Sequence, residues 1–389
     1  MAGFGTAPAW LNRAALAAEG GKRNRILVTI FQRGAADGLN MVVPFGEKNY
    51  YQSRPSIAVP PPGKPDGALD LDGRFALHPA MPGFARMYKA GHLAIVEACG
   101  SHDATRSHFD AQDYMESGTP GVKSTRDGWL NRGLEGKPAS PVRAVAVGSR
   151  LPRALRGASS AVAVANIAGF KVQEKESAGM FEQMYTRSGD TQLMGAGRDT
   201  FEAVKLLESI GKGGYTPGNG AQYPPGRFAQ SMQQIARLIK ADAGVEVAFA
   251  DIGGWDHHTN EAAQLPNLLR EFSGAITAFC DDLGDRMADV VLVTMSEFGR
   301  TAHENGNRGT DHGHANVMFV VGGGVRGGRI LGPWPGLDRD QLYEGRDLAV
   351  TTDFRQVLSE VAQRQMGRFD PAKVFPGFRS ATPIGIAAG

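Results

Sequence analysis

Short apolar runs alternate along the chain with polar loops and with segments of helical periodicity. The runs show no regular apolar–polar alternation, which is typical of strands that are buried on both faces. Amphipathic patterns with a repeat of about 3.6 residues are clearest over 227–241 and 261–287. The order of strand, polar loop and helix predicts an α/β fold with a mostly parallel central sheet sandwiched by helices. The predicted strands comprise residues 25–31, 92–97, 142–147, 245–250, 289–294 and 317–321.

The order of apolar strand, polar loop and amphipathic helix is less clear between residues 148 and 226. Short helical segments at 179–185 and 200–210 are separated by glycine and serine, and this part of the chain contains no histidine. We interpret residues 148–226 as an insertion or cap within a single domain that comprises residues 25–389.

Residues 1–24 precede the first predicted strand and include an alanine-rich stretch. Ala15 and Ala17 have the spacing of the small residues at a signal-peptide cleavage site, but the basic start and the full apolar core of such a signal are missing. We interpret the segment as the remnant of an export signal, with a plain alanine-rich tail as the alternative. The first interpretation predicts a periplasmic or secreted protein, whereas a chain that is complete as given would be cytoplasmic.

Charge and composition exclude several classes of partner and site. Lysine and arginine number 42 and aspartate and glutamate 40, so the net charge gives no argument for a nucleic-acid partner or an acidic membrane surface. No apolar run reaches the roughly eighteen residues that a transmembrane helix needs. The only two cysteines, Cys99 and Cys280, exclude a disulfide framework and a thiolate metal cluster. A metal site in this chain therefore has to use carboxylates and imidazoles.

The polar loops after the predicted strands hold such side chains, most densely over 294–316. In a parallel sheet the carboxyl ends of the strands share one edge, so residues far apart in the sequence converge there. Aspartate, glutamate and histidine suit a divalent ion such as Zn, Mn, Mg or Ca. The alternatives are a turn-stabilising role for Asp37 and a helix-capping role for residues 256–258. The candidate metal ligands are Asp37, Asp256, His257, His258, Glu297, Asp311, His312 and His314, with the choice between His257 and His258 left open.

Ser107 begins a predicted helix that extends to about Glu116, and Asp110 completes the pattern of a capping box. In one interpretation Ser107 only caps this helix. In the other, the free N–H groups at the helix start attract an anion, and Ser107 attacks phosphorus or sulfur once a metal ion lowers its pKa. Thr105 is a weaker rival for this role. The candidate catalytic residues are Ser107, Arg106, His108 and Arg300.

Six motifs in combination resemble a known family. They are R-G-A-A-D-G-L at 33–39, R-S-H-F-D-A-Q-D-Y-M-E at 106–116, G-W-L-N-R at 128–132, G-G-W-D-H-H at 253–258, S-E-F-G-R at 296–300 and G-T-D-H-G-H-A-N at 309–316. Together they resemble the bacterial domain-of-unknown-function 1501 family over about residues 25–337. That family is grouped by fold with the alkaline phosphatase and sulfatase superfamily, and its own activity is largely uncharacterised. The resemblance implies an alkaline-phosphatase-like fold and export by a twin-arginine signal, although the arginine pair itself is absent.

The resemblance to that superfamily also implies roles for individual residues. Ser107 falls where the superfamily has its nucleophile, but it is followed by His-Phe-Asp, so the sulfatase signature with x-Pro-x-Arg is absent. Glu297 lies where the superfamily has an Asp–His pair, so that position is altered. The residues that match the other ligand motifs are Asp37 after the first strand, Asp256 with His257 or His258, and Asp311, His312 and His314 in the last histidine-bearing motif.

These observations support three hypotheses about function. The first is an exported, metal-dependent hydrolase of phosphate or sulfate esters, acting on a small anionic ester or on a sulfated or phosphorylated glycan. The second is a non-catalytic exported protein of the same fold that acts in binding or assembly, for which the altered position at Glu297 is an argument. The third is a lyase or isomerase with a metal-held oxyanion and a histidine base. The sequence does not indicate the oligomeric state.

Overall fold

The computed structural model describes residues 25–134, 136, 140–167, 191–367, 369–379 and 382–387. The alanine-rich segment at 1–24, interpreted above as an export-signal remnant, and the helical segment expected at 179–185 lie outside the described residues. The localisation inferred from the first of them stays a prediction.

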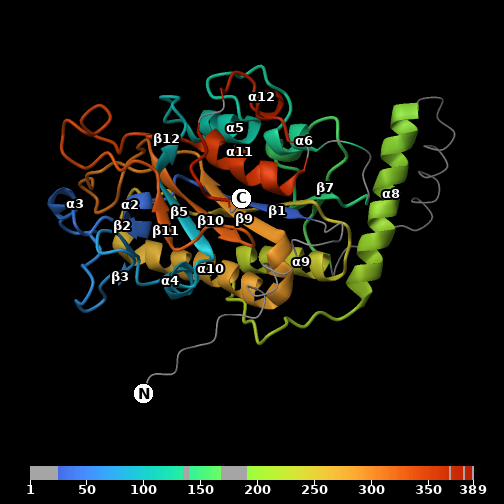
Figure 1. Ribbon diagram of the computed structural model, residues 1–389, viewed down its shortest axis with the longest axis horizontal. Coiled ribbons are helices and arrows are strands. Elements are labelled where there is room, and N and C mark those ends of the chain that lie inside the picture. The colour runs from blue at the N-terminus through green and yellow to red at the C-terminus, as the bar shows by residue number, and fades with distance from the viewer. Residues whose placement is uncertain are drawn as a thin grey trace.

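A large central sheet organises the described part of the chain (Figure 1). All its pairings are parallel except those of β10, which runs antiparallel to both of its neighbours. The predicted α/β fold with a mostly parallel sheet is therefore confirmed. In spatial order the strands are β11 (Arg329–Leu331), β5 (Leu93–Gly100), β10 (Asn316–Gly322), β9 (Val290–Ser296), β1 (Ile26–Arg33), β8 (Val247–Gly253), β6 (Ala144–Val147) and β7 (Val162–Val164), and β12 (Thr352–Asp353) pairs with β5.

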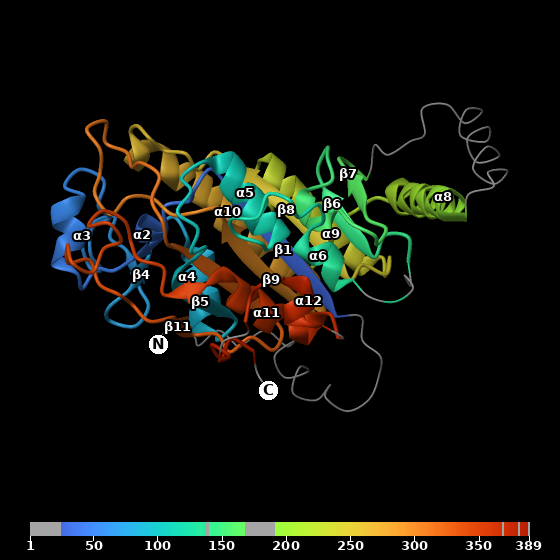
Figure 2. The same ribbon diagram turned by 90° about the horizontal axis from the view of Figure 1, so that it is seen from above.

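Helices cover both faces of this sheet, as the two views show (Figures 1 and 2). On β1, Val28 and Ile30 pack into the apolar cluster of one helical layer, whereas Leu27 and Phe31 pack into that of the other. Burial on both faces explains why the strands are continuous apolar runs rather than alternating ones. The helices of the first layer are α4 (Pro82–Lys89), α9 (Arg227–Lys240) and α10 (Glu261–Leu283), and those of the second are α5 (His108–Ser117), α6 (Trp129–Gly133), α11 (Phe354–Gln365) and α12 (Pro371–Val374).

The segment predicted as an insertion, 148–226, contributes one strand to the main sheet and helices outside it. It contains the 3-10 turn η1 (Arg153–Leu155) and strand β7, which pairs with β6 and extends the main sheet. Helix α8 (Thr191–Lys212) lies at the same end of the molecule, to the right in Figure 1. No helix within the described ranges combines the length and the apolar character that crossing a membrane requires.

A small three-stranded sheet lies beside the main one and is reached directly from β1. It comprises β2 (Val42–Val43), β4 (Ala76–Leu77) and β3 (Leu69–Asp70), and the short helices α2 (Gly38–Met41) and α3 (Lys48–Ser53) belong to the same part of the chain. The second 3-10 turn, η2 (Gly284–Asp289), joins α10 to β9.

A buried ion pair fixes this small unit to the loop after β9. Asp37 caps α2 by accepting a hydrogen bond from the Leu39 N–H at 3.2 Å, and it accepts a second from Arg54 Nη1 at 2.5 Å. The same guanidinium donates to the carbonyl oxygens of Thr301 and Ala302 at 2.8 and 3.0 Å. Burial raises the pKa of Asp37, but the Arg54 charge together with hydrogen bonds from Arg54 and Glu261 outweighs this effect, and the net shift is downward. Asp37, a predicted metal ligand, thus points into the protein interior.

We expect Arg54→Met to cost about 3–5 kcal/mol in the free energy of unfolding, because it leaves the buried Asp37 carboxylate without its cation. Arg86→Met is the matched control, since it breaks the exposed pair of Arg86 with Asp281 and should cost at most about 1 kcal/mol. Urea unfolding of both variants measures the difference. Equal losses in the two variants would contradict this account of the Asp37 environment.

Candidate metal centre

The candidate residues meet at the edge of the sheet where β5, β9, β1 and β8 end. His108 is the first residue of α5, Asp256 lies in the loop after β8, and His312 lies in the loop before β10. Because β10 is antiparallel to its neighbours, its start lies at the edge where they end. The topology therefore brings together side chains from three distant parts of the sequence, as a parallel sheet does for ligand sites in general.

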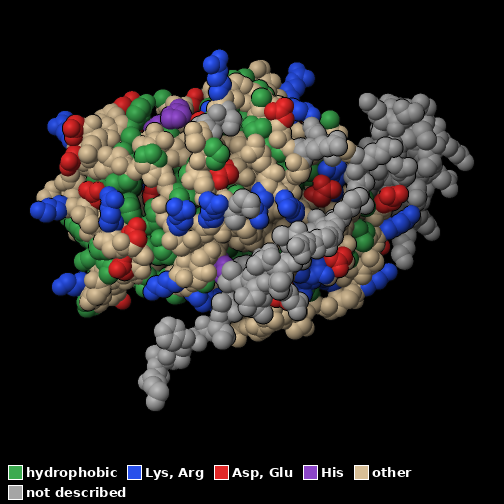
Figure 3. Space-filling model, in the orientation of Figure 1, with side chains coloured by type: hydrophobic (Ala, Val, Ile, Leu, Met, Phe, Trp, Pro, Cys, Tyr) green, Lys and Arg blue, Asp and Glu red, His purple; other side chains and the backbone are tan. Residues whose placement is uncertain are grey.

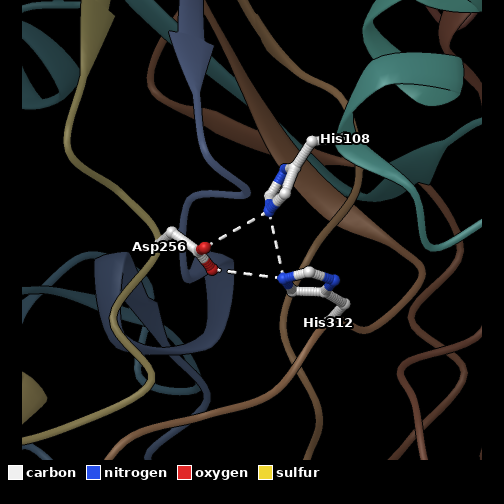
Figure 4. Close-up of side chains that lie close together, drawn as sticks. All are labelled: His108, Asp256 and His312. Carbon is white, nitrogen blue, oxygen red and sulfur yellow. Dashed lines mark hydrogen bonds and ion pairs between the residues drawn. The ribbon is translucent and has the colours of Figure 1, made fainter.

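His108, Asp256 and His312 point toward one another from these three elements (Figure 4). The Nε2 atoms of the two histidines are 3.0 Å apart. His108 Nε2 lies 3.4 Å from Asp256 Oδ2, and His312 Nε2 lies 3.2 Å from Asp256 Oδ1. One ligand atom from each residue thus falls within 4.8 Å of the other two. We call this set the His–Asp centre.

Hydrogen bonds at Nδ1 determine which nitrogen of each ring faces the centre. His108 Nδ1 is 2.8 Å from Glu297 Oε1, and His312 Nδ1 is 2.9 Å from the carbonyl oxygen of Arg106. A carboxylate and a carbonyl can only accept, so each Nδ1 is the donor. In a neutral ring the Nε2 atom then carries a lone pair, and both lone pairs are directed into the centre.

Two lone pairs and a carboxylate at such distances repel one another unless a proton or a metal ion lies between them. A tetrahedral zinc ion, with bonds of about 2.0–2.1 Å, separates neighbouring ligand atoms by about 3.3 Å. The distance of 3.0 Å between the two Nε2 atoms is close to that spacing, as are the distances of 3.2 and 3.4 Å from His312 and His108 to the two different oxygens of Asp256. The donor set of two imidazoles and one carboxylate, with Nδ1 bonds orienting the rings, fits a divalent ion of the zinc type.

The two imidazoles of the centre differ in how readily they take up a proton. The hydrogen bond to Glu297 raises the pKa of His108, although burial of the ring opposes this effect. Burial lowers the pKa of His312. For Asp256, burial raises the pKa, but hydrogen bonding to Arg300 and the charge of that side chain outweigh it and lower the pKa. The carboxylate is thus held ionised and able to bind a cation.

His258 is a further imidazole beside the centre. Its Nε2 lies 2.9 Å from Asp256 Oδ1 and 3.0 Å from His312 Nε2, and its Nδ1 lies 3.0 Å from Asp311 Oδ1. The Asp311 carboxylate therefore orients His258 in the way that Glu297 orients His108. Asn305 Nδ2 holds Asp311 in turn, at 3.1 Å.

The two arginines predicted as catalytic residues, Arg300 and Arg106, both pair with carboxylates of the protein. Arg300 is buried and donates to Asp256 Oδ1 at 2.5 Å and to both oxygens of Thr310, so it holds the Asp256 carboxylate in place. Arg106 pairs with Glu344 and Asp347 at 2.6 and 2.8 Å.

The carboxylate of Glu297, a predicted metal ligand, accepts four hydrogen bonds from protein groups. Besides His108, its Oε1 accepts from the Gly34 N–H and from Gln112 Nε2, each at 2.8 Å, and its Oε2 accepts from Ser296 Oγ at 3.1 Å. Burial raises its pKa, but the bond from His108 and the other donors lower it below the usual value. Gln112 was not singled out in the sequence, although it lies one helical turn after His108, where side chains share a face.

The structure does not bring all predicted ligands together. The His257 ring is buried, and its Nδ1 has no hydrogen-bond partner among the described residues. His314 stacks on Tyr343 with ring centroids 4.3 Å apart. Ser107 is exposed at the N-cap of α5 and makes no side-chain bond to the helix, and Thr105 Oγ1 accepts from its N–H at 3.2 Å.

Two glycines allow the loop 309–316 to approach its neighbours closely. A Cβ atom on Gly309 would collide with the backbone of His258, and one on Gly313 would collide with that of Arg300. The resulting centre is open to solvent on one side, since the Asp256 and His258 side chains are 42% and 41% exposed. Figure 3 shows a group of histidine side chains at the surface near the upper edge of the molecule.

Several solved structures are distantly similar to this chain. One is a sulfatase from Pseudoalteromonas sp., with 12% sequence identity and a TM-score of 0.42. The similarity covers 98% of this chain and 76% of that chain. Another is the C-terminal periplasmic domain of EcEptC from Escherichia coli in complex with Zn, with 9% identity, coverage of 94% of this chain and 90% of that chain, and a TM-score of 0.40. A third is a protein in the alkaline phosphatase superfamily from Vibrio parahaemolyticus, with 10% identity, coverage of 80% of this chain and 63% of that chain, and a TM-score of 0.36. At these TM-scores the similarities carry no argument about function, and the chain covers less than two thirds of the Vibrio protein.

The family assignment depends on sequence. No curated protein matches the chain. The family model described as "Protein of unknown function (DUF1501)" matches residues 24–377, which is most of the 389 residues and includes every residue of the His–Asp centre. The chain therefore belongs to the DUF1501 family.

Proposed function

We propose that this protein is a metal-dependent hydrolase of phosphate or sulfate esters. The observation that carries the proposal is that two imidazole nitrogens and one ionised carboxylate lie within 4.8 Å of one another, with each histidine oriented by a hydrogen bond at Nδ1. Such a set is typical of a catalytic zinc site, in which protein ligands leave one position open. The partial exposure of the centre is consistent with access for a substrate.

His108, Asp256 and His312 would hold the ion, and zinc is the ion that their donor types and spacing favour. When bound, the ion would supply a Lewis acid that polarises the ester and lowers the pKa of a nearby nucleophile. Glu297 and Arg300 would maintain the geometry, since the first orients His108 and the second holds Asp256. His258 has its Nε2 directed at the same point and is either a fourth ligand or the group that exchanges a proton with the substrate.

Ser107 is the nucleophile that we favour, with Thr105 as the alternative. Its hydroxyl is exposed, is not used as a helix cap and directly precedes His108. Attack on the ester would form the bond from Ser107 Oγ to phosphorus or sulfur while the bond to the leaving oxygen breaks, and the serine proton would pass to the solvent or to the leaving oxygen. Water would then hydrolyse the serine ester, which releases phosphate or sulfate and restores the hydroxyl. The N–H groups at the start of α5 would stabilise the negative charge of the group under attack.

A second candidate is a non-catalytic protein in which the metal ion only stabilises the loops around the sheet edge. The observation that favours it is that Arg106 and Arg300, which a hydrolase could use to neutralise an anion, are both committed to internal partners. This candidate shares the metal site with the first and differs in predicting no turnover.

We expect the purified wild-type protein to contain about one divalent ion per chain. His312→Ala and Asp256→Ala should abolish binding, because each removes a ligand. His303→Ala is the matched control, since His303 is exposed in the same loop and should not affect the metal content. Elemental analysis by mass spectrometry measures the content. A wild type without metal, even after incubation with zinc, would overturn the proposed site.

Glu297→Gln should lower zinc affinity by about 10–100-fold, as the loss of a partner that orients a ligand does elsewhere. The variant has almost the same shape but no longer offers His108 a charged acceptor. Competition with a coloured zinc chelator gives the affinity, and thermal unfolding checks that the fold is intact. Unchanged affinity in a folded variant would show that Glu297 does not orient a ligand.

Hydrolysis of an aryl phosphate or an aryl sulfate should require the metal ion, and Ser107→Ala should lower kcat by about 100-fold or more. Thr105→Ala tests the alternative nucleophile in the same assay. Metal-loaded protein that turns over neither ester class would instead support the non-catalytic candidate.

A further inference from the structure

A second concave site lies beside the His–Asp centre, along α5. Its volume is about 480 Å³, within the range of about 300–1,000 Å³ that is typical of ligand sites. We call it the arginine cleft. The ends of β1, β6 and β8, helix α5 and the loop that leads to η1 form its walls. The lining residues that matter here are Arg33, Phe109, Arg150, Arg153, Arg156 and Asp251.

Helix α5 is a wall that the cleft and the His–Asp centre share. His108 faces the centre, whereas the next residue, Phe109, and Gln112 line the cleft. Gln112 connects the two sites, because its Nε2 donates to Glu297 and its Oε1 accepts from Arg33 Nη1 at 2.9 Å. The sites are thus about one helical turn apart, roughly 5 Å along the axis. The two sites therefore adjoin neighbouring residues of one helix.

Two of the cleft's arginines have guanidinium nitrogens free to bind a ligand. Arg33 is used by Glu116 and Asp251, at 3.0 and 2.7 Å. Within the part of the chain that the structure describes, Arg150 makes no hydrogen bond or ion pair. Arg156 uses only its Nε, which donates to a carbonyl oxygen at 3.2 Å. Arg150 and Arg156 are exposed, and within the described residues no carboxylate pairs with either side chain.

Arg153 is a third arginine of the cleft, close to Arg156. It pairs with Asp113, yet its Nε is enclosed and has no partner among the described residues. Burial and the neighbouring Arg156 lower the pKa of the Arg153 guanidinium, so the two cations oppose each other. An anionic group bound between them would relieve this repulsion and would accept charge-assisted hydrogen bonds.

The remaining walls suit a hydroxylated ring rather than a chain of phosphates. Phe109 is 90% exposed at the rim, a high value for so large an apolar ring, and it offers a flat surface on which a ring can stack. Asp251 is 47% exposed, and its carboxylate can accept hydrogen bonds from hydroxyl groups. Together with Asp113 and Glu116, it would repel a ligand that carries negative charge at every unit.

We propose that the arginine cleft binds a sugar unit that carries a sulfate or phosphate group, next to the unit whose ester is cleaved at the His–Asp centre. Arg150 and Arg156 bind the anionic group, Phe109 stacks on the sugar ring, and Asp251 accepts from its hydroxyl groups. This inference rests on the proposed hydrolase function and narrows its substrate to an anionic oligosaccharide. In this proposal the arginine cleft only binds the neighbouring sugar unit, and ester cleavage takes place at the His–Asp centre.

Binding of a chondroitin sulfate tetrasaccharide, measured by titration calorimetry at low salt, tests the assignment. We expect Arg150→Ala combined with Arg156→Ala to weaken binding at least about tenfold, and Phe109→Ala to weaken it by several fold. Arg86→Ala combined with Lys89→Ala is the matched control. It removes the same charge from α4, on the other face of the sheet, and should bind like the wild type.

Other ligands show whether the sulfate group and the sugar ring both contribute to the affinity. The desulfated tetrasaccharide should bind at least about tenfold more weakly than the sulfated one. The proposal is overturned if the Arg150/Arg156 variant binds like its control or if desulfation has no effect. It is also overturned if the wild type binds a phosphopeptide or an anionic phospholipid vesicle but not the tetrasaccharide.

One variant separates this proposal from the proposed function. His312→Ala should lose the metal ion and still bind the tetrasaccharide, because the cleft does not include His312. Tetrasaccharide binding by a wild-type protein that holds no metal ion or cleaves no ester would support the cleft and refute the hydrolase. Loss of binding in this variant, with the fold intact by circular dichroism, would contradict a separate binding site.

Discussion

The direction of the imidazole lone pairs is the constraint on which the site depends. Glu297 and the Arg106 carbonyl accept from the Nδ1 atoms of His108 and His312, so both Nε2 atoms face Asp256. Without a cation between them, these groups repel one another. The energy needed to hold them together comes from the surrounding scaffold, above all from Arg300 on Asp256 and from the four donors on Glu297.

The sheet supplies that scaffold through one antiparallel strand. β10 lies between β5 and β9, and its reversed direction brings the loop with His312 to the edge where the parallel strands end. The glycines of that loop allow it to lie against the turn that carries His258. The Asp37–Arg54 pair fixes the other side of the same loop through the carbonyls of residues 301 and 302. Fold stability and site geometry are therefore linked.

Much of the fold and part of the site could be predicted from the sequence. The continuous apolar runs indicated strands buried on both faces, and the rule that parallel strand ends share an edge brought residues 108, 256, 258, 297 and 312 together. The direction of each side chain could not be predicted. Asp37 has the same chemistry as Asp256, and only the position of Arg54, set by the path through α3, turns it inward.

Neighbouring histidines also show that the sequence does not predict the direction of a side chain. His257 and His258 are indistinguishable in sequence, yet one ring is buried in the interior and the other contacts Asp256. His314 belongs to the same motif as His312 and stacks on Tyr343, a partner outside that motif. His108 was expected among the catalytic residues, and the position of its Nε2 beside Asp256 and His312 makes it a proposed ligand instead.

The most direct test of the central claim is the position of the metal ion itself. Crystals of the zinc-loaded protein, with diffraction data collected on both sides of the zinc absorption edge, locate the ion by its anomalous signal. We predict one strong peak bonded to His108 Nε2, His312 Nε2 and an oxygen of Asp256, at about 2.0–2.2 Å from each. An absence of signal at this point, or a peak bound by other residues, would contradict the account.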